Sequence, residues 1–188
     1  HYFVDAVLEE LNSIYGPELM NSGGLRIFTT LDSKLQKSAE EAALHHLKFL
    51  DRKLVQGKEK LQVAVVTIDN NSGAVRVMLG GTNYEKSQFN RALSINRMVG
   101  SSFKPFVYMS AMQNLGYHPG TVLVDEPMIF ELPHNKKWEP ANYNDEYMGP
   151  VVLKKALAKS LNVISAKLIF KVKPAEVVKT ARKFGFTS

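Results

Sequence analysis

The sequence predicts an α+β fold, with a β-hairpin in the first half of the chain and helices through most of the second half. Two runs rich in β-branched and apolar residues, 61–68 and 74–79, flank a short polar segment. Apolar residues recur at helical spacing in several other segments. Hydrophobic residues make up 45% of the 188 positions, which is enough to bury a sizeable core. We therefore expect a globular chain.

The segments before the hairpin are expected to be a helix, a strand and a second helix. Residues 3–14 carry apolar side chains at helical spacing, and a Gly-Pro pair then breaks the pattern. Residues 25–30 have the composition of a strand. Asp32 can cap a long helix over residues 33–54, because its carboxylate can accept hydrogen bonds from the first free backbone N–H groups.

The hairpin is the clearest β element of the sequence. Residues 69–73 join its two runs and include Asp, Asn and Gly, which tolerate the left-handed backbone conformations of tight turns. A two-stranded hairpin is only marginally stable by itself. We therefore expect this one to form the edge of a larger antiparallel sheet that packs against helices.

The second half is expected to be helical around one long irregular segment. A helical pattern begins near Ser101 and ends at Gly116. Residues 117–150 are rich in Pro, Gly, Asn and aromatic residues, and connections of this length are usually functional. Three further helices are predicted, over 151–159, over 163–171 and from Pro174 to Gly185.

Composition and charge narrow the possible functions. The chain has no Cys, which excludes disulfide scaffolds, thiolate zinc sites and Cys nucleophiles. His45 and His46 are adjacent, so they point to different sides of their helix and are expected to be solvated rather than to bind a metal. The formal net charge of +6 suits nucleic acid, an anionic membrane surface or an anionic polymer such as cell wall. Charge alone does not choose among these partners.

A Ser-x-x-Lys motif stands at the start of the helix that begins near Ser101. The spacing of three residues puts the Ser101 hydroxyl and the Lys104 ammonium on the same helical face. A serine becomes a good nucleophile when a neighbouring base takes its proton, and a lysine with a lowered pKa can serve as that base. The helix N-terminus would also direct backbone N–H groups towards an oxyanion.

The motif is weak evidence in isolation, because Ser-x-x-Lys arises by chance about once in a chain of this size. A serine at a helix start is commonly only a cap. A second polar pair, Ser160 and Asn162, lies between two predicted helices, where a loop can turn both side chains into a cleft. This pair is also weak when taken alone.

The order and spacing of these motifs give them specificity, because together they resemble the transpeptidase domain of class A penicillin-binding proteins. Ser-x-x-Lys and Ser-x-Asn belong to the motif set of penicillin-recognising enzymes. The resemblance covers nearly the whole chain, from the Thr-Thr-Leu-Asp run at 29–32 onwards. The residues that carry it are Gly80-Gly81, Tyr84, the run 87–92, the run 100–106, Trp138, Pro140, Asn142-Tyr143 and the run 160–163.

The resemblance implies a role for each matching residue. Ser101 would attack the carbonyl of the penultimate D-alanine of a peptidoglycan stem peptide and form an acyl-enzyme, with Lys104 as its base. Ser160 would relay a proton towards the leaving amine, and Asn162 would hold the substrate backbone. An amine of a neighbouring stem peptide would then take the acyl group, and β-lactams would acylate the same serine.

The resemblance also implies a substrate cleft and no cofactor or metal. Trp138, Asn142 and Tyr143 would line that cleft as substrate-binding residues. Residues 98–99 are Met-Val where the family usually has Gln-Pro, which makes the entry to the nucleophile helix less rigid.

The third motif of the family, Lys-Thr-Gly on a strand that faces the serine, is absent from these 188 residues. A Lys-Thr-Ala run at 179–181 lies in a helical pattern and does not replace it. The resemblance therefore implies an incomplete β-lactamase-like fold, with residues 1–30 as a linker and 31–188 as the N-terminal portion of the transpeptidase domain. We expect the remaining strands and motif on another chain, packed against residues 61–80, and expect this chain to be inactive alone.

The parent implied by the resemblance is a bifunctional peptidoglycan synthase with an upstream glycosyltransferase domain and one membrane anchor, at the extracytoplasmic face of a bacterial membrane. The first residue is His1 rather than Met, as expected of a piece of a longer protein. Two alternatives remain open. The same site could serve a D,D-carboxypeptidase, a β-lactamase or a β-lactam sensor, or the chain could be a non-catalytic module that binds an anionic polymer, whereas the resemblance implies no nucleic acid partner.

Overall fold

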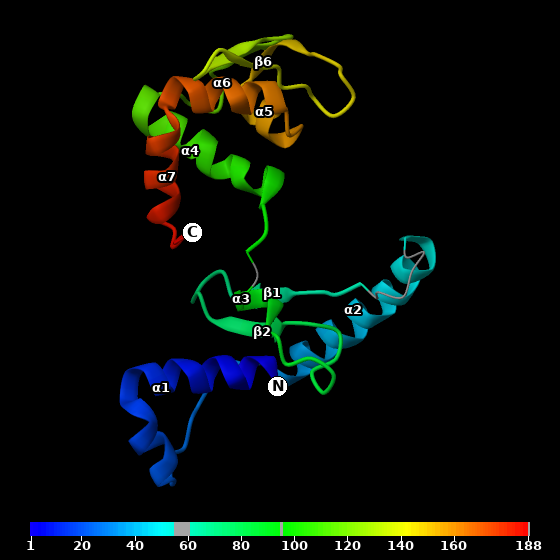
Figure 1. Cartoon of the computed structure of the whole chain (residues 1–188), viewed down its shortest axis with the longest axis vertical. Helices are drawn as coiled ribbons and strands as arrows, with labels where there is room; N and C mark the ends of the chain where they lie inside the picture. The colour runs from blue at the N-terminus through cyan, green and yellow to red at the C-terminus, as the bar shows by residue number, and fades with distance from the viewer. Residues whose placement is uncertain (55–60, 95, 188) are drawn as a thin grey trace. The chain divides into compact units, whose positions relative to one another are not determined.

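The computed structural model describes residues 1–54, 61–94 and 96–187. The chain folds into two compact units, His1–Arg97 and Met98–Ser188 (Figure 1). The first unit holds two long helices and one hairpin, and the second holds a helical cluster with two small hairpin-like ladders.

Both helices predicted for the first unit are present. Helix α1, Tyr2–Ser22, is broken at Gly16, whose φ of 78° and ψ of 162° are not helical. Pro17 restarts the helix, since its fixed φ suits a first helical position. Helix α2 spans Ser33–Leu54, and Asp32 Oδ1 accepts hydrogen bonds from the N–H groups of residues 34 and 35, both at 3.0 Å. The predicted cap is confirmed.

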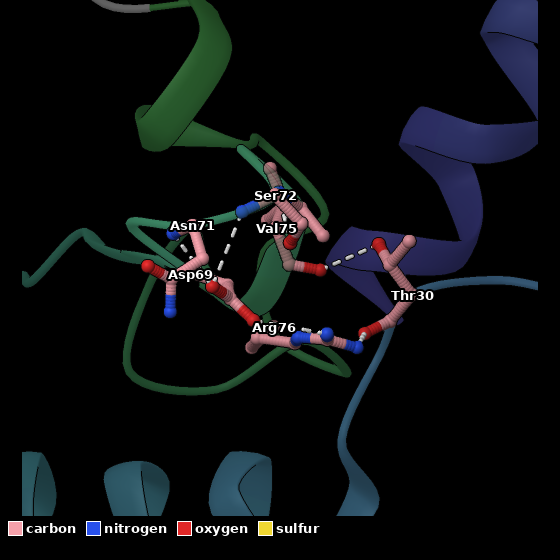
Figure 2. A network of polar contacts seen from close by, with 7 residues as sticks. Thr30, Asp69, Asn71, Ser72, Val75 and Arg76 are labelled. Carbon is pink, nitrogen blue, oxygen red and sulfur yellow. Dashed lines mark hydrogen bonds and ion pairs between the residues drawn. The ribbon is translucent and has the colours of Figure 1, made fainter.

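The predicted hairpin is also confirmed, with shorter strands. Strands β1, Val65–Ile68, and β2, Val75–Leu79, pair antiparallel. Its turn is held by the carboxylate of Asp69, which accepts hydrogen bonds from the backbone N–H of Asn71 at 2.9 Å and of Ser72 at 3.3 Å (Figure 2). These bonds, together with one from the Arg76 side chain at 3.2 Å, hold the pKa of Asp69 below its ordinary value.

The predicted strand over residues 25–30 is not formed, and that prediction is wrong. The segment meets β2 only at its end, where the Thr30 hydroxyl donates to the carbonyl of Val75 at 2.7 Å and Arg76 donates to the carbonyl of Thr30 at 3.3 Å (Figure 2). A strand needs a continuous ladder of backbone bonds, and side-chain bonds replace it here. The apolar side chains of Leu25, Ile27 and Phe28 stay exposed.

The free edge of β2 is closed by a side chain of α2. Gln36 is buried, and its amide accepts a hydrogen bond from Met78 N at 3.0 Å and donates to Met78 O at 3.2 Å. A side-chain amide thus takes the place that a third strand would fill at this point. Within the described residues the sheet has two strands, and the larger sheet expected around it stays a prediction.

The second unit is built on helices that follow the predicted pattern. Its core is formed by the faces of α4, Lys104–Leu115, and α6, Asn162–Val172, with α7, Pro174–Arg182, packed beside them (Figure 1). The short helices η1, Gly100–Phe103, and α5, Leu153–Ala158, precede α4 and α6. The run at 179–181 lies inside α7, as expected. Fully buried members of the core include Val107, Tyr108, Leu153, Ile164 and Leu168.

The segment 117–150, predicted to be irregular, contains short strands. Strand β3, Val122–Asp125, pairs antiparallel with β6, Gly149–Val152, and β4, Phe130–Leu132, pairs with β5, Lys136–Trp138. Each has only three or four residues, which is too short to show a periodic pattern among Pro and Asn residues. A short helix α3, Arg91–Ser94, was likewise not predicted. The β3–β6 ladder brings the two ends of the long segment together.

Candidate active site

Ser101 lies in the tight first turn before α4. Gly100 opens that turn with a φ of 56°, a left-handed conformation that favours glycine. An added Cβ at Gly100 would meet nothing within 4 Å, so its backbone conformation rather than close packing is what requires glycine. In a 3₁₀ helix residues three apart are in line, which places Lys104 one turn beyond Ser101.

Lys104 is the buried cation of the site, with 8% of its surface exposed. Its Nζ donates hydrogen bonds to Ser160 O at 2.5 Å, to Ser160 Oγ at 2.9 Å and to Asn162 Oδ1 at 2.7 Å. All three acceptors are neutral, and no carboxylate of the described residues forms an ion pair with Lys104. Burial lowers the pKa of Lys104 below its ordinary value of 10.5. A lysine whose pKa is lowered loses its proton more readily, and the neutral amine can then accept a proton.

Ser160 occupies a strained position at the end of α5. Its φ is 54°, in the left-handed region where glycine is usual. The N–H of Ser160 donates to Leu157 O at 2.9 Å, and the N–H of Leu161 donates to Ala156 O at 3.0 Å. This pair of bonds is a Schellman motif. The motif turns both the carbonyl and the hydroxyl of Ser160 towards Lys104.

Asn162 begins α6 directly after that turn. Its side chain bridges two segments, because Oδ1 accepts from Lys104 Nζ and Nδ2 donates to Ala141 O at 2.9 Å. The backbone N–H groups of Asn162 and Val163, free at a helix start, donate to Asn142 Oδ1 at 2.8 and 3.3 Å. Asn142 therefore caps the helix that carries Asn162.

Asp125 stands behind Asn142 and was not singled out from the sequence. Its side chain is fully buried, and its carboxylate oxygens accept hydrogen bonds from Asn142 Nδ2 at 3.1 and 3.0 Å. Met148 N donates to the same carboxylate at 3.0 Å. In the sequence Asp125 precedes Glu-Pro and looks like an ordinary loop residue, so no local pattern could have indicated its contacts.

A cavity of about 550 Å³ connects the predicted residues. Ser101, Ser160 and Asn162 contribute to its wall, as do Asn142 and the fully exposed Tyr143. Trp138 does not line this cavity; its ring stacks in a group with Phe130 and Phe170. Lys159 and Glu146 supply the charged groups of the wall. The cavity wall thus includes five of the seven predicted residues, and Lys104 bonds to two of these five, Ser160 and Asn162.

The arrangement can support acyl transfer in which a serine attacks and a buried lysine takes the proton. In the described part of the chain, the three hydrogen bonds from Lys104 Nζ go to Ser160 and Asn162, and none goes to Ser101 Oγ. A charged ammonium that donates to these three acceptors has no N–H left for Ser101 Oγ and no lone pair to accept its proton. Loss of one proton would leave a lone pair with which Nζ could accept the proton of Ser101.

Comparison with known sequences gives a match to a protein family. Residues 63–188 match the family described as penicillin binding protein transpeptidase domain. The chain is 35% identical over 188 residues to penicillin-binding protein 1B of Escherichia coli and 36% identical over 177 residues to that of Vibrio cholerae. These matches take in 97% and 94% of this chain and 22% of each relative. Penicillin-binding protein 2D of Bacillus subtilis is 32% identical over 191 residues, 26% of its length.

Comparison with solved structures gives the same fold. The chain is similar to PonA1 of Mycobacterium tuberculosis in complex with penicillin V, with a TM-score of 0.77 and 29% identity. That match covers 96% of this chain and 45% of PonA1. Penicillin-binding protein 1A of Haemophilus influenzae has a TM-score of 0.81 at 24% identity, over 99% of this chain and 41% of its own, and shows the fold alone. The chain thus spans less than half of each of these proteins.

Proposed function

The chain belongs to the penicillin-binding protein transpeptidase family, and on this premise we propose that it forms part of a serine D,D-transpeptidase that cross-links peptidoglycan. Ser101 would be the nucleophile and Lys104 its base. Ser160 would relay a proton, and Asn162 would bind the substrate backbone. The observation that carries the proposal is the Lys104–Ser160–Asn162 network, which lies at the same cavity as Ser101.

The proposed reaction begins with attack on a peptide carbonyl. Ser101 Oγ bonds to the carbonyl carbon of the penultimate D-alanine as its proton moves to neutral Lys104 Nζ. The bond from that carbon to the nitrogen of the terminal D-alanine then breaks, and Ser160 Oγ passes the proton from Lys104 to the leaving amine. The product is an ester on Ser101. An amine of a second stem peptide attacks this ester, restores the serine hydroxyl and completes the cross-link.

A β-lactam would react at the same place, because its ring amide offers the same carbonyl to the serine. The likeness to PonA1, solved in complex with penicillin V, supports this part of the proposal. Asn142 and Tyr143, which contribute to the cavity wall, are the proposed substrate contacts. For Trp138, outside this wall, a substrate contact remains a proposal that rests on the family resemblance alone.

We further propose that residues outside these 188 complete the cleft. The sequence has no Lys-Thr-Gly, and the strand that carries this motif in the family would supply the second wall. In the parent, residues 1–30 would link this domain to a glycosyltransferase domain, and an upstream anchor would hold the protein at the extracytoplasmic membrane face. No helix in the described part of the chain has the length and apolar character to cross a bilayer.

Product analysis tests the proposal. The intact protein that contains these residues is incubated with a donor peptide ending in D-Ala-D-Ala, with and without an acceptor amine. We expect release of D-alanine in both cases and a cross-linked peptide only when the amine is present, and no reaction for Ser101→Ala. Release without any cross-link would indicate a carboxypeptidase instead, and full activity of the Ser101→Ala variant would refute the site.

A further inference from the structure

We propose that Asp125 is the positioning residue of this site, because it fixes the orientation of the Asn142 amide and through it the start of α6. The inference rests on the proposed function, since it assigns to Asp125 an effect on acylation of Ser101. Asp125 does not line the cavity, but it accepts hydrogen bonds from two residues that do, Asn142 and the backbone of Met148. Of these two, Asn142 is the one that also bonds to the start of α6.

Asn142 uses its whole hydrogen-bonding capacity. Nδ2 donates one proton to the Asp125 carboxylate, at 3.1 and 3.0 Å from its two oxygens, and the other to Glu146 O at 3.0 Å. Oδ1 accepts from the backbone N–H groups of Asn162 and Val163. Only 7% of Asn142 is exposed, so water cannot replace these partners at low cost.

The Asp125 carboxylate favours one orientation of the Asn142 amide. An ionised carboxylate only accepts hydrogen bonds, so it holds the NH₂ group of Asn142 and leaves Oδ1 for the N–H groups of α6. If the amide turned over, its oxygen would face the Asp125 carboxylate and its NH₂ would face two N–H donors. Both contacts would be repulsive. Asp125 and the N–H groups of α6 therefore favour the same one of the two orientations that the amide shape alone would permit.

The orientation matters because Asn142 Oδ1 caps the start of α6, next to the turn whose Ser160 and Asn162 accept from Lys104 Nζ. The capped N–H of Asn162 follows Ser160 by two residues, and the side chain of Asn162 accepts from Lys104 Nζ. Displacing the start of α6 would move these two acceptors relative to Lys104. Reacting groups that shift by about 1 Å can lose about 100-fold in rate.

The test exchanges the two polar groups in the intact protein and follows acylation by a penicillin. Single-turnover kinetics separates penicillin binding from the first-order acylation step, at a temperature where each variant is folded. Asp125→Asn should slow that step about 10- to 100-fold. Asn142→Asp should also slow it, because two carboxylates then meet. The double variant again pairs a donor at 125 with acceptors at 142, although the carbonyl of Glu146 still lacks its donor. It should therefore acylate more slowly than the wild type but about tenfold faster than either single variant.

Glu126→Gln is the matched control, since it removes the same charge one residue later. Glu126 is exposed and its carboxylate bonds to Lys167, outside the cavity. Its acylation rate should stay within about twofold of the wild type. An Asp125→Asn variant that acylates as fast as this control, or a double variant no faster than the slower single variant, would overturn the proposal. If Asp125→Asn does not fold, the double variant is compared with Asn142→Asp, and a double variant that acylates no faster would overturn the proposal.

Amide deuterium exchange gives a readout that does not depend on the chemistry. The peptide that contains Asn162 and Val163 should exchange faster in Asp125→Asn than in the wild type or in the control, because Asn142 no longer holds its oxygen towards them. Unchanged exchange would overturn the positioning role. If the wild type is not acylated at all, the proposed function fails, and exchange still tests Asp125.

Discussion

Ser160 presents both its carbonyl and its hydroxyl to Lys104, at 2.5 and 2.9 Å from Nζ, and it does so from a left-handed backbone conformation with a φ of 54°. Non-glycine residues adopt this conformation at a cost of about 1–2 kcal/mol. The strain lies at the Schellman turn between α5 and α6. The local cost thus accompanies a contact that the proposed mechanism requires.

Replacing Ser160 should separate stability from activity. Ser160→Gly removes the left-handed strain, so it should unfold with a free energy about 1 kcal/mol higher than Ser160→Ala. Both variants lose the hydroxyl that would relay the proton, so both should acylate about 100-fold more slowly than the wild type. Chemical unfolding and penicillin acylation kinetics measure the two effects. Equal stability of the two variants would argue against strain at this position.

The pH dependence of acylation should follow the neutral form of Lys104. Burial lowers the pKa of Lys104, so the rate should rise with pH and level off below the ordinary value of 10.5. Lys104→Arg should abolish acylation across the same range, since arginine keeps its proton. Measurement of the acylation rate from pH 6 to about 11 tests this. A rate that rises only through the ordinary lysine pKa would show that Lys104 is not the base.

The same lowered pKa has a consequence for stability. The unfolded chain holds the proton of Lys104 up to a higher pH than the folded chain does. The burial penalty is therefore complete at pH values below the folded-state pKa, and it disappears as the pH rises towards 10.5. Lys104→Met removes the penalty, so the gain in unfolding free energy over the wild type should be larger at pH 6 than at high pH. A pH-independent difference would contradict the assignment.

Gly100 should be required for its backbone conformation. Gly100→Ala meets no atom within 4 Å, yet it must hold a φ of 56°, so the folded state should lose about 1 kcal/mol. Gly100→Asn is the matched control, because asparagine adopts this conformation more readily. Thermal unfolding should rank the glycine protein first, the Asn variant second and the Ala variant last. A more stable Ala variant would show that this turn relaxes to another conformation.

Asp32 should contribute to stability as the cap of α2. Its carboxylate accepts from two backbone N–H groups at the helix start, so Asp32→Ala should lower the unfolding free energy by about 1 kcal/mol. Asp32→Asn keeps an acceptor and should lose less than half of that. Denaturant titration followed by far-ultraviolet circular dichroism measures both. Equal losses would mean that the cap bonds do not contribute.

The elements that could be predicted from sequence are those with local signals. Helix α2 was expected from Asp32 onwards and the hairpin from its turn residues, and both are present because caps and tight turns depend on neighbouring residues. The strand expected over residues 25–30 failed since a strand depends on a distant partner. Strands β3 to β6 were not predicted, because each also depends on a pairing partner and because they are short.

In the candidate site, too, the residues with local sequence signals could be predicted and the contacts between distant residues could not. Ser101 and Lys104 are joined by a local spacing, and Ser160 and Asn162 by another, so both pairs were accessible to sequence reasoning. The hydrogen bonds from Lys104 Nζ to Ser160 and Asn162 join residues 56 and 58 positions apart, so no local pattern could indicate them. Asp125 lies 17 residues from Asn142 in the sequence, and its contact with Asn142 depends on complete burial that the Glu-Pro pair after it does not suggest.

Covalent labelling by a penicillin tests whether Ser101 is the nucleophile. The intact protein is incubated with a penicillin, and its mass is compared with those of the Ser101→Ala and Ser102→Ala variants. We expect one penicilloyl adduct on the wild type and on Ser102→Ala, and none on Ser101→Ala. An adduct that persists in Ser101→Ala, or a wild type that is never labelled, would contradict it.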